Sequence, residues 1–492
     1  MNDDSITFYR YCITEKPTAK DLEQMVDIFA AANVDTLTQC VHCRWQATYD
    51  SKVVEVAGDL TPEAVQPWEW IQYWQWHTCR RRLIAQGNDP PKVIARRCRQ
   101  RGMSFLPSFR LNDQHGMHPH EGHYGSFRRE HPGWIIGQKA MDYGVPQVRE
   151  HILKVAQELA ERYEMDGLDL DFMRWPVYFK SKEVEANTGV MTDFVGQIRA
   201  ILDETGNRRG RHLLLSVRVP LRIGEGKVTD GLPPDSSDIE CLGIGLDVRT
   251  WVKERGLVDM VCPMNFFYTD WHTMIENMAE WRALTDGTEC GLYPTIHGRP
   301  WKDYEPPYIS AESYRGAAYS FYLHGADGIA LYNLWEDNAI GWEAVRDMGS
   351  PRVLSAKPRR YHCYLGDLMS VAKGERKTVG FYLPEDPTAP DVQARLRFTA
   401  VNLTLDHCIE LDVNGRPVDK ETLLFERRGP GRPAPAGAPR LPYFHIVELP
   451  LAGTAAFKGK NLLGVKLVEI NPEIPKKDTI EIGRVEAFFE PT

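Results

Sequence analysis

Residues 166–176 read Asp-Gly-Leu-Asp-Leu-Asp-Phe-Met-Arg-Trp-Pro, and this pattern predicts a β-strand that ends at a polar mouth. Side chains alternate across a strand, so the leucines and the phenylalanine share one face, and Asp169, Asp171 and Met173 share the other. Two carboxylates inside an apolar strand are costly to bury. We therefore expect them to have partners or a chemical role.

Seven further segments resemble strands, and helical patterns lie between most of them. The eight predicted strands are 6–13, 34–42, 104–110, 167–173, 213–219, 257–266, 291–297 and 328–335. Strands that alternate with helices form a parallel sheet, and eight such units predict a closed (β/α)8 TIM barrel. The alternative is an open doubly wound sheet, but no glycine-rich phosphate loop follows the first strand. Catalytic groups of such barrels lie at the C-terminal strand ends.

The sequence pattern changes after Ser350. Beyond it, apolar and polar residues alternate as they do in half-buried strands, and the helical periodicity ends. Segments of this kind include 395–401, 408–413 and 462–468. They predict antiparallel strands, and Asn414-Gly415 is a typical hairpin turn. We therefore expect two domains, a barrel at residues 1–352 and a jelly-roll-like, all-β sandwich at residues 353–492.

Composition and charge restrict the class of protein. The chain is 42% hydrophobic and 26% charged, and its net charge of −9 argues against nucleic-acid binding. No apolar run of about 18 residues predicts a membrane span. The first residues lack the basic and apolar regions of a signal peptide. We expect a soluble protein, cytoplasmic if this N-terminus is native, otherwise secreted or periplasmic with its signal removed. The oligomeric state stays open.

The motif Cys40-Val41-His42-Cys43 is similar in spacing to metal and redox motifs. Residues three apart on a regular strand face opposite sides, and no second pair lies at zinc spacing. The sequence therefore favours two buried thiols over a metal or redox site.

Polar residues also alternate on the other predicted strands. Those expected at the mouth are Thr38, His42, Arg110, Asn112, Ser216, Arg218, Thr295, His297, Asn333, Trp335, Glu336 and Asp337. An alternative to a catalytic role is that Arg110 and Arg218 simply neutralise the two acids in buried ion pairs. This alternative is stronger for Asp169 than for Asp171, which lies nearer the mouth. The histidine-rich loop 111–144 could bind metal, but its spacing is irregular.

Two families resemble this barrel. Asp171, Arg174 and Pro176 resemble the Asp-Asp-Ile-Arg-Tyr-Pro motif of glycosyl hydrolase-like family 10. Residues 166–173 also resemble the family 18 chitinase motif, Asp-Gly-x-Asp-x-Asp-x-Glu, and residues 258–266 are similar to the sixth strand of both groups. Trp335 resembles the last-strand tryptophan that forms the base of the sugar-binding subsite in chitinases. The resemblance implies a glycoside hydrolase acting on a polysaccharide or oligosaccharide, without an organic cofactor.

The chain departs from the chitinase pattern at the general acid, where it has Met173, and at the sixth-strand tyrosine, where it has Phe266. Asp171 would then need a second carboxylate, because glycoside hydrolysis uses two. Glu336 is the first choice, followed by Asp337, Asp270, Glu121 and Asp113. Whether the enzyme retains or inverts the anomeric configuration stays open.

Other residues would support the catalytic carboxylate. Asp169 and the arginines would set the charge state of Asp171. Candidate substrate contacts are Trp335, His297, Asn265, Tyr268, Asn112 and His42, and Arg110, Arg174 and Arg218 could steer an anionic sugar.

Two other functions stay open. A non-catalytic carbohydrate-binding barrel would explain Met173. A metal-dependent hydrolase would use His42, Asp169 and the loop histidines. The C-terminal segments 409–418 and 459–465 resemble galactose-binding-like domains, many of which only buttress a barrel.

Overall fold

The computed structural model describes residues 1–3, 16–58, 74–114, 125–137, 139–227, 238–265, 271–297, 310–334, 339–364, 367–428, 444–473 and 478–492. The chain divides into two compact units. One comprises Met1–Phe267, Asn277–Pro300 and Gly325–Gly349, and the other comprises Tyr268–Glu276, Trp301–His324 and Ser350–Thr492. The predicted domain boundary after residue 352 stays a prediction.

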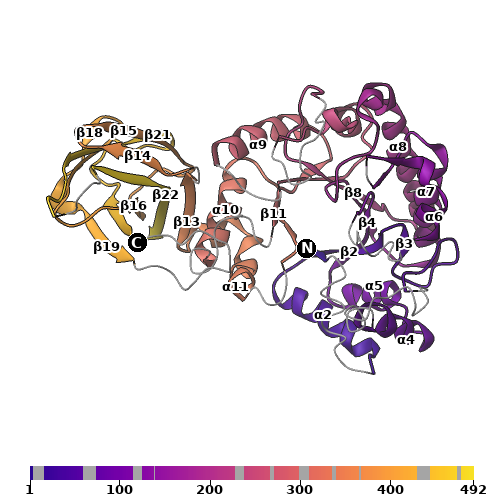
Figure 1. Ribbon diagram of the computed structural model, residues 1–492. Coiled ribbons are helices and arrows are strands. Elements are labelled where there is room, and N and C mark those ends of the chain that lie inside the picture. Colours follow the sequence, from indigo (N-terminus) through magenta and orange to yellow (C-terminus); the bar gives the residue numbers. More distant parts are fainter. Residues whose placement is uncertain are drawn as a thin grey trace. The chain divides into compact units, whose positions relative to one another are not determined.

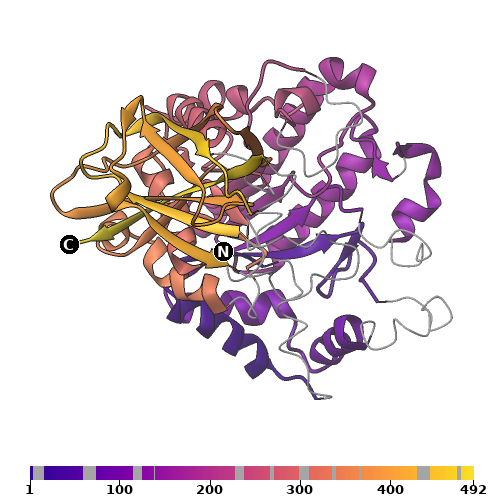
Figure 2. The same cartoon turned by 60° about the vertical axis from the view of Figure 1, so that its left-hand side comes forward.

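The first unit contains a closed barrel of eight parallel strand positions with helices outside it (Figure 1; Figure 2). The strands in sheet order are β1 (Asn2–Asp3), β2 (Thr36–Cys43), β4 (Ser104–Arg110), β7 (Gly167–Asp171), β8 (Leu214–Pro220), β9 (Met260–Met264), β11 (Thr295–His297) and β12 (Ala330–Tyr332). β1 closes the ring, because it pairs with both β12 and β2. The seventh position is divided, since β10 (Gly291–Leu292) pairs with β9 just before β11.

The predicted barrel is therefore confirmed. The predicted first strand, residues 6–13, lies outside the described residues, and β1 occupies the first position of the sheet. The connecting helices are α2 (Ala19–Ala31), α4 (Cys79–Ala85), α5 (Pro90–Gln100), α6 (Ser126–Glu130), α7 (Pro146–Arg162), α8 (Val184–Arg209), α9 (Trp271–Thr285) and α11 (Ala339–Met348).

Local sequence explains where several helices begin and end. α5 and α7 each begin at a proline, whose missing N–H would have no partner in the first turn anyway. α2 begins with a reciprocal cap between Thr18 and Asp21, and the backbone N–H of Thr18 lies 2.7 Å from Asp21 Oδ2. α8 ends at Gly210, whose φ of 65° is the left-handed conformation that glycine adopts readily.

An irregularity in β2 affects the direction of its side chains. Cys40 pairs with Ser108, but His42, not Val41, pairs with Phe109. The extra residue is a β-bulge, which resets the alternation of the strand. A tight turn follows, in which Arg44 and Trp45 have φ values of 52° and 63°. It leads into β3 (Gln46–Ala47).

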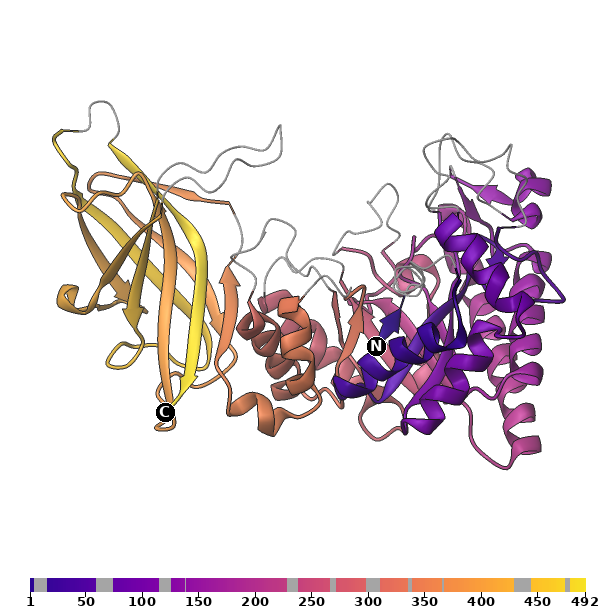
Figure 3. The same cartoon turned by 90° about the horizontal axis from the view of Figure 1, so that it is seen from below.

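The second unit contains the predicted β-sandwich (Figure 3). One sheet has the strands β13 (Arg359–Tyr364), β22 (Thr479–Pro491), β16 (Val392–Val401), β20 (Phe444–Pro450) and β19 (Leu424–Arg428), with β14 (Met369–Ala372) also on β22. The other has β15 (Arg376–Leu383), β21 (Gly459–Glu469), β17 (Cys408–Val413) and β18 (Arg416–Pro417). Buried side chains of both sheets form one core, including Phe398, Val447, Leu411 and Val465. The predicted turn at Asn414-Gly415 joins β17 to β18.

The second unit also contains α10 (Ala311–Leu323) and the short α12 (Pro351–Ser355). Gly316 of α10 lies against the carbonyl of Arg360 in β13, where no side chain would fit. Ser313 Oγ lies 2.9 Å from His362 Nε2, and His362 Nδ1 lies 3.0 Å from Glu486 Oε1. Both Ser313 and His362 are fully buried. The close contact and the polar chain fix α10 against β13.

Candidate active site

Two layers of polar side chains face the interior of the barrel near the C-terminal strand ends. In the lower layer, Ser108, Asp169 and Ser216 are in register on β4, β7 and β8. In the upper layer, the residues in register on the same strands are Arg110, Asp171 and Arg218. All six are buried. The register therefore brings the two predicted acids together with the two predicted arginines.

Asp169 is fully buried, and three side chains hold it. Ser108 donates to Oδ2 at 2.6 Å, Ser216 donates to Oδ1 at 2.7 Å, and Arg218 Nη1 lies 3.6 Å from Oδ2. Both carboxylate oxygens thus have short hydrogen bonds from hydroxyl groups. These contacts are those of an internal counterion to Arg218.

Asp171 has looser contacts. Its Oδ1 accepts from the backbone N–H of Met173 at 2.9 Å, while its Oδ2 lies 3.4 Å from the Tyr332 hydroxyl and 3.9 Å from Arg218 Nη1. Burial raises the pKa of Asp171 above its ordinary value. Arg218 and Arg110 oppose this shift, and the neighbouring Asp169 adds to it. Asp171 is therefore a carboxyl group with an increased tendency to hold a proton.

Arg218 is the central cation of the site. Burial alone would lower its pKa, but the charges of Asp169 and Asp171 outweigh burial and raise it. Its guanidinium carbon lies 5.0 Å from the centre of the Tyr332 ring, in a cation–π contact. The prediction that an arginine pairs with the acids thus describes the geometry of Arg218.

Tyr332 belongs to the site but is absent from the predicted residues. It is fully buried at the end of β12, and its hydroxyl lies 3.4 Å from both Asp171 Oδ2 and Arg110 Nη2. The alternation expected on this strand, which turned Asn333 inward, is wrong by one residue. Tyr332 is in register with His297, whose ring centre lies 6.0 Å from that of Tyr332. Alternation counted from Gly328, the first residue of the predicted strand, puts Tyr332 on the opposite face from Asn333 and could have found it.

Met173 lies where the chitinase motif has its acid. It is buried against Met264 and Tyr332, so this side of the site is apolar. Apolar walls strengthen the electrostatic interactions of the neighbouring charges, because they exclude water.

Asp113 is the candidate partner of Asp171 that the structure places near the site. It is buried, and its Oδ2 lies 3.5 Å from Arg110 Nη1. Arg110 in turn contacts the Tyr332 hydroxyl, so a chain of polar contacts runs from Asp113 to Asp171. The other candidates for the second acid lie outside the described residues: Glu336, Asp337, Asp270 and Glu121.

Two predicted residues have other surroundings. Asn112 is buried, and its side-chain amide forms hydrogen bonds with the backbone of Met141 and Val177. His42 is turned to the outer face by the bulge in β2, where its ring packs on Phe109 and its Nε2 lies 3.3 Å from His151 Nε2. Neither side chain joins Asp171.

The remaining predicted residues lie around the strand ends or cannot be placed. Asn265 is buried directly after β9, and His297 is half-buried at the end of β11. Arg174 stacks over Trp175, with its guanidinium carbon 5.0 Å from the ring centre. Tyr268 and Trp335 lie outside the described residues.

The backbone is strained beside the site. Trp175 follows β7 with a φ of 56°, and Asn333 follows β12 with a φ of 51°. Asparagine adopts this left-handed conformation readily, but a bulky residue such as Trp175 rarely does, and such strain is often found at functional sites. Both residues follow strands that carry Asp171 or Tyr332.

No group of three or more potential metal ligands occurs in the part of the chain that the structure describes. His42 and Asp169 lie on opposite faces of the barrel wall, so they do not share a site. Four of the loop histidines of the metal hypothesis lie at 115–123, outside the described residues, and a fifth, His131, is described, with its Nδ1 2.6 Å from the Phe127 carbonyl oxygen.

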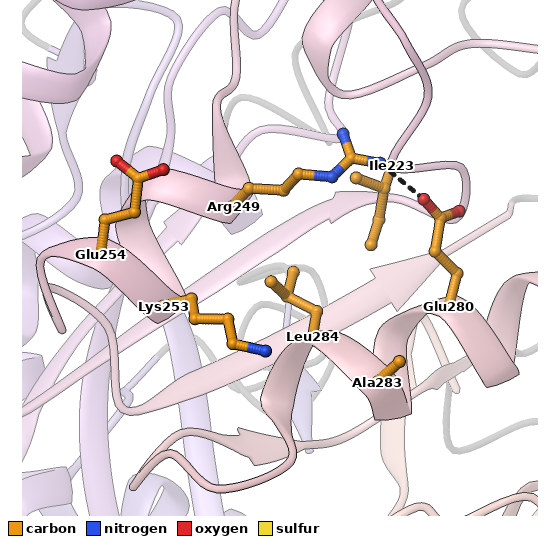
Figure 4. Close-up of a pocket in the computed structure, with 7 residues that line it drawn as sticks. All are labelled: Ile223, Arg249, Lys253, Glu254, Glu280, Ala283 and Leu284. Atoms are coloured by element: carbon orange, nitrogen blue, oxygen red, sulfur yellow. Dashed lines mark hydrogen bonds and ion pairs between the residues drawn. The ribbon is translucent and has the colours of Figure 1, made fainter.

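A surface cavity of about 400 Å³ lies elsewhere on the first unit (Figure 4). Its lining residues are Ile223, Arg249, Lys253, Glu254, Glu280, Ala283 and Leu284. Arg249 and Glu280 form an ion pair of 2.7 Å, so two of its charges are neutralised. None of the acids or arginines of the barrel interior lines this cavity.

No protein-family model and no curated protein matches the chain. Solved structures of glycoside hydrolases are similar to it at low identity. The PgaB glycoside hydrolase domain from Bordetella bronchiseptica is 12% identical, with a TM-score of 0.42, and the match covers 69% of this chain and 96% of that one. An Anoxybacillus α-amylase is 10% identical, with a TM-score of 0.39, and the match covers 96% of each chain. A Cycas revoluta GH18 chitinase is 13% identical, with a TM-score of 0.38, and the match covers 68% of this chain and 98% of that one.

Among the described residues, no helix is both long and apolar enough to span a membrane.

Proposed function

We propose that the barrel is a glycoside hydrolase acting on a polysaccharide or oligosaccharide, with Asp171 as its proton-donating carboxyl group. The single observation that carries this proposal is the surroundings of Asp171: a buried carboxyl at a C-terminal strand end, with loose contacts and a raised pKa. A general acid must hold its proton near the working pH, and burial is one way in which glycosidases achieve this.

The second carboxylate would activate water or attack the sugar directly. Asp113 is the candidate among the described residues, because it is buried near the site with its Oδ2 3.5 Å from Arg110 Nη1. Glu336 stays a proposal on the sequence alone. In this scheme, Arg110, Arg174, His297 and Asn265 would contact the substrate, together with Tyr268 and Trp335.

The proposal is tested by measuring the release of reducing sugars from a broad panel of glycans. The native chain should release sugar from one class of glycan, and Asp171→Asn should not. Asp166→Asn is the matched control, because Asp166 lies in the same motif but at the other end of β7, where it pairs with Arg211. The control should keep its activity. Release by Asp171→Asn at the native rate would refute the role of Asp171.

A carbohydrate-binding barrel without catalysis is the second candidate, and Met173 favours it. This side chain replaces the acid of the chitinase motif and is packed into an apolar wall. Under this alternative, both the native chain and Asp171→Asn would bind one glycan in a calorimetric titration, and neither would release sugar.

A further inference from the structure

The Cys40-Val41-His42-Cys43 motif differs from the arrangement that a regular strand would give. Both cysteines are free and buried, as the sequence predicts. However, the bulge places His42 opposite Phe109 on the outer face, so the next residue returns to the inner face. Cys40 is already on the inner face, in register with Ser108. The two thiols therefore lie on the same side of β2.

The two thiols also influence each other. The Cys40 thiol donates to the carbonyl oxygen of His42 at 3.5 Å, and each of the two thiols shifts the pKa of the other. Cys43 ends the strand at the tight turn of Arg44 and Trp45, and it is the more exposed of the pair, at 8% against 1%. A small reagent would therefore reach Cys43 first.

The Cys40 thiol lowers the pKa of Cys43 to about 6, assisted by the charge of Arg44. Burial opposes this shift. The effect on Cys40 is the reverse, because the Cys43 thiol and burial raise its pKa. In the barrel wall, burial raises the pKa of Cys262 to about 11. A thiolate is the reactive form of cysteine, so the pair has one activated and one resolving sulfur.

We propose that Cys40 and Cys43 are a redox-active pair that closes to a disulfide by exchange with a low-molecular-weight disulfide. The Cys43 thiolate attacks one sulfur of that disulfide and releases the first small thiolate. The Cys40 thiol loses its proton and attacks the Cys43 sulfur of the mixed disulfide, which releases the second. Two protein thiols are oxidised, and one small disulfide is reduced to two thiols.

The pair adjoins the candidate active site. The charges of both Arg110 and Asp113 act on the two cysteines. Closing the disulfide removes the negative charge of Cys43 beside Arg110, whose side chain contacts Tyr332. An effect of the disulfide on hydrolysis rests on the proposed function, whereas disulfide formation does not.

The test uses the full chain in mixtures of reduced and oxidised glutathione. Samples are quenched with acid, unfolded, labelled with N-ethylmaleimide and digested with trypsin. The peptide 21–44 contains Cys40 and Cys43 and no other cysteine. In oxidising mixtures it should lose two hydrogen atoms and take no label, and dithiothreitol should restore both labels. The peptide containing Cys262, another inward thiol beside an arginine, should take its label throughout.

Two variants separate the roles of the sulfurs. Cys40→Ser should accumulate a mixed disulfide between Cys43 and glutathione, and Cys43→Ser should not. If a variant fails to fold, the labelling of peptide 21–44 in the native chain still tests the proposal. Two labels on peptide 21–44 at every glutathione ratio would overturn the proposal. So would parallel oxidation of Cys262, because it would indicate general unfolding rather than a reactive pair.

Discussion

The hydroxyl of Tyr332 lies 3.4 Å from Asp171 Oδ2, and the face of its ring lies 5.0 Å from the Arg218 guanidinium carbon. One buried side chain thus contacts both the acid and the cation that partly neutralises it. The hydroxyl also lies 3.4 Å from Arg110 Nη2, so it can accept from the arginine while it donates to the acid. Tyr332 therefore fixes the orientation of the carboxyl that we propose as the proton donor.

Tyr332→Phe removes this hydroxyl and keeps the ring. A hydrogen bond to a charged group contributes about 1.5 kcal/mol or more, so we expect kcat/KM for glycan hydrolysis to fall about tenfold. Tyr49→Phe is the matched control, because the buried Tyr49 hydroxyl donates to Glu158 at 2.8 Å outside the site. The control should lose stability without losing activity. Equal kcat/KM in Tyr332→Phe and the native chain would exclude the positioning role.

The raised pKa of Asp171 predicts how stability depends on pH. The folded state holds this proton at pH values where the unfolded carboxyl, with a pKa of about 3.9, has released it. The folded state then binds more protons than the unfolded state, so stability falls as the pH rises through the raised pKa. Urea unfolding over this pH window should show the decline in the native chain, and Asp171→Asn should lack it. An identical pH dependence in the two proteins would contradict the raised pKa.

The buried pair His42 and His151 predicts that, at acid pH, folding stability changes with pH in the opposite direction. Burial lowers the pKa of His151 to about 4 and that of His42 well below its ordinary value. Below about pH 6.5 the unfolded state takes up protons that the folded state excludes, so stability falls as the pH falls. The shift of His151 from 6.5 to about 4 corresponds to about 3 kcal/mol.

His151→Phe should therefore move the acid-unfolding midpoint to lower pH, because the ring packs among Trp45 and Phe127 without titrating. His212→Gln is the control, since His212 is exposed and pairs with Asp259. Circular dichroism during an acid titration measures both. The same displacement in the control would show that burial of His151 is not the cause.

Much of the inner site could be predicted because three neighbouring strands are regular. Strict alternation on β4, β7 and β8 puts Arg110, Asp171 and Arg218 on one face, and parallel register puts them side by side. The ends of strands were less predictable. On β12 the inward residue is Tyr332, one position before Asn333, where the backbone turns left-handed.

The failures share a physical origin, which is backbone geometry that sequence alternation does not encode. The bulge in β2 turns His42 outward and brings Cys43 to the side of Cys40. Asn112 lies just past β4, as predicted, but its amide binds the backbone carbonyls of Met141 and Val177. A polar residue after a strand thus has two possible uses, and only the positions of the loops distinguish them.

Met173 tests whether the site could use the acid of the chitinase motif. Its side chain is buried against Met264 and Tyr332, and the adjacent Asp171 already places one buried carboxyl group beside it. Met173→Glu should therefore lower the free energy of unfolding by about 3 kcal/mol or more at neutral pH, with part recovered in acid as the carboxyl protonates. Met173→Leu keeps the apolar wall and should cost less than about 1.5 kcal/mol. Urea unfolding compares the two variants. A glutamate variant as stable as the leucine variant would mean that the wall admits a charge, and that a proton donor at residue 173 is compatible with this barrel.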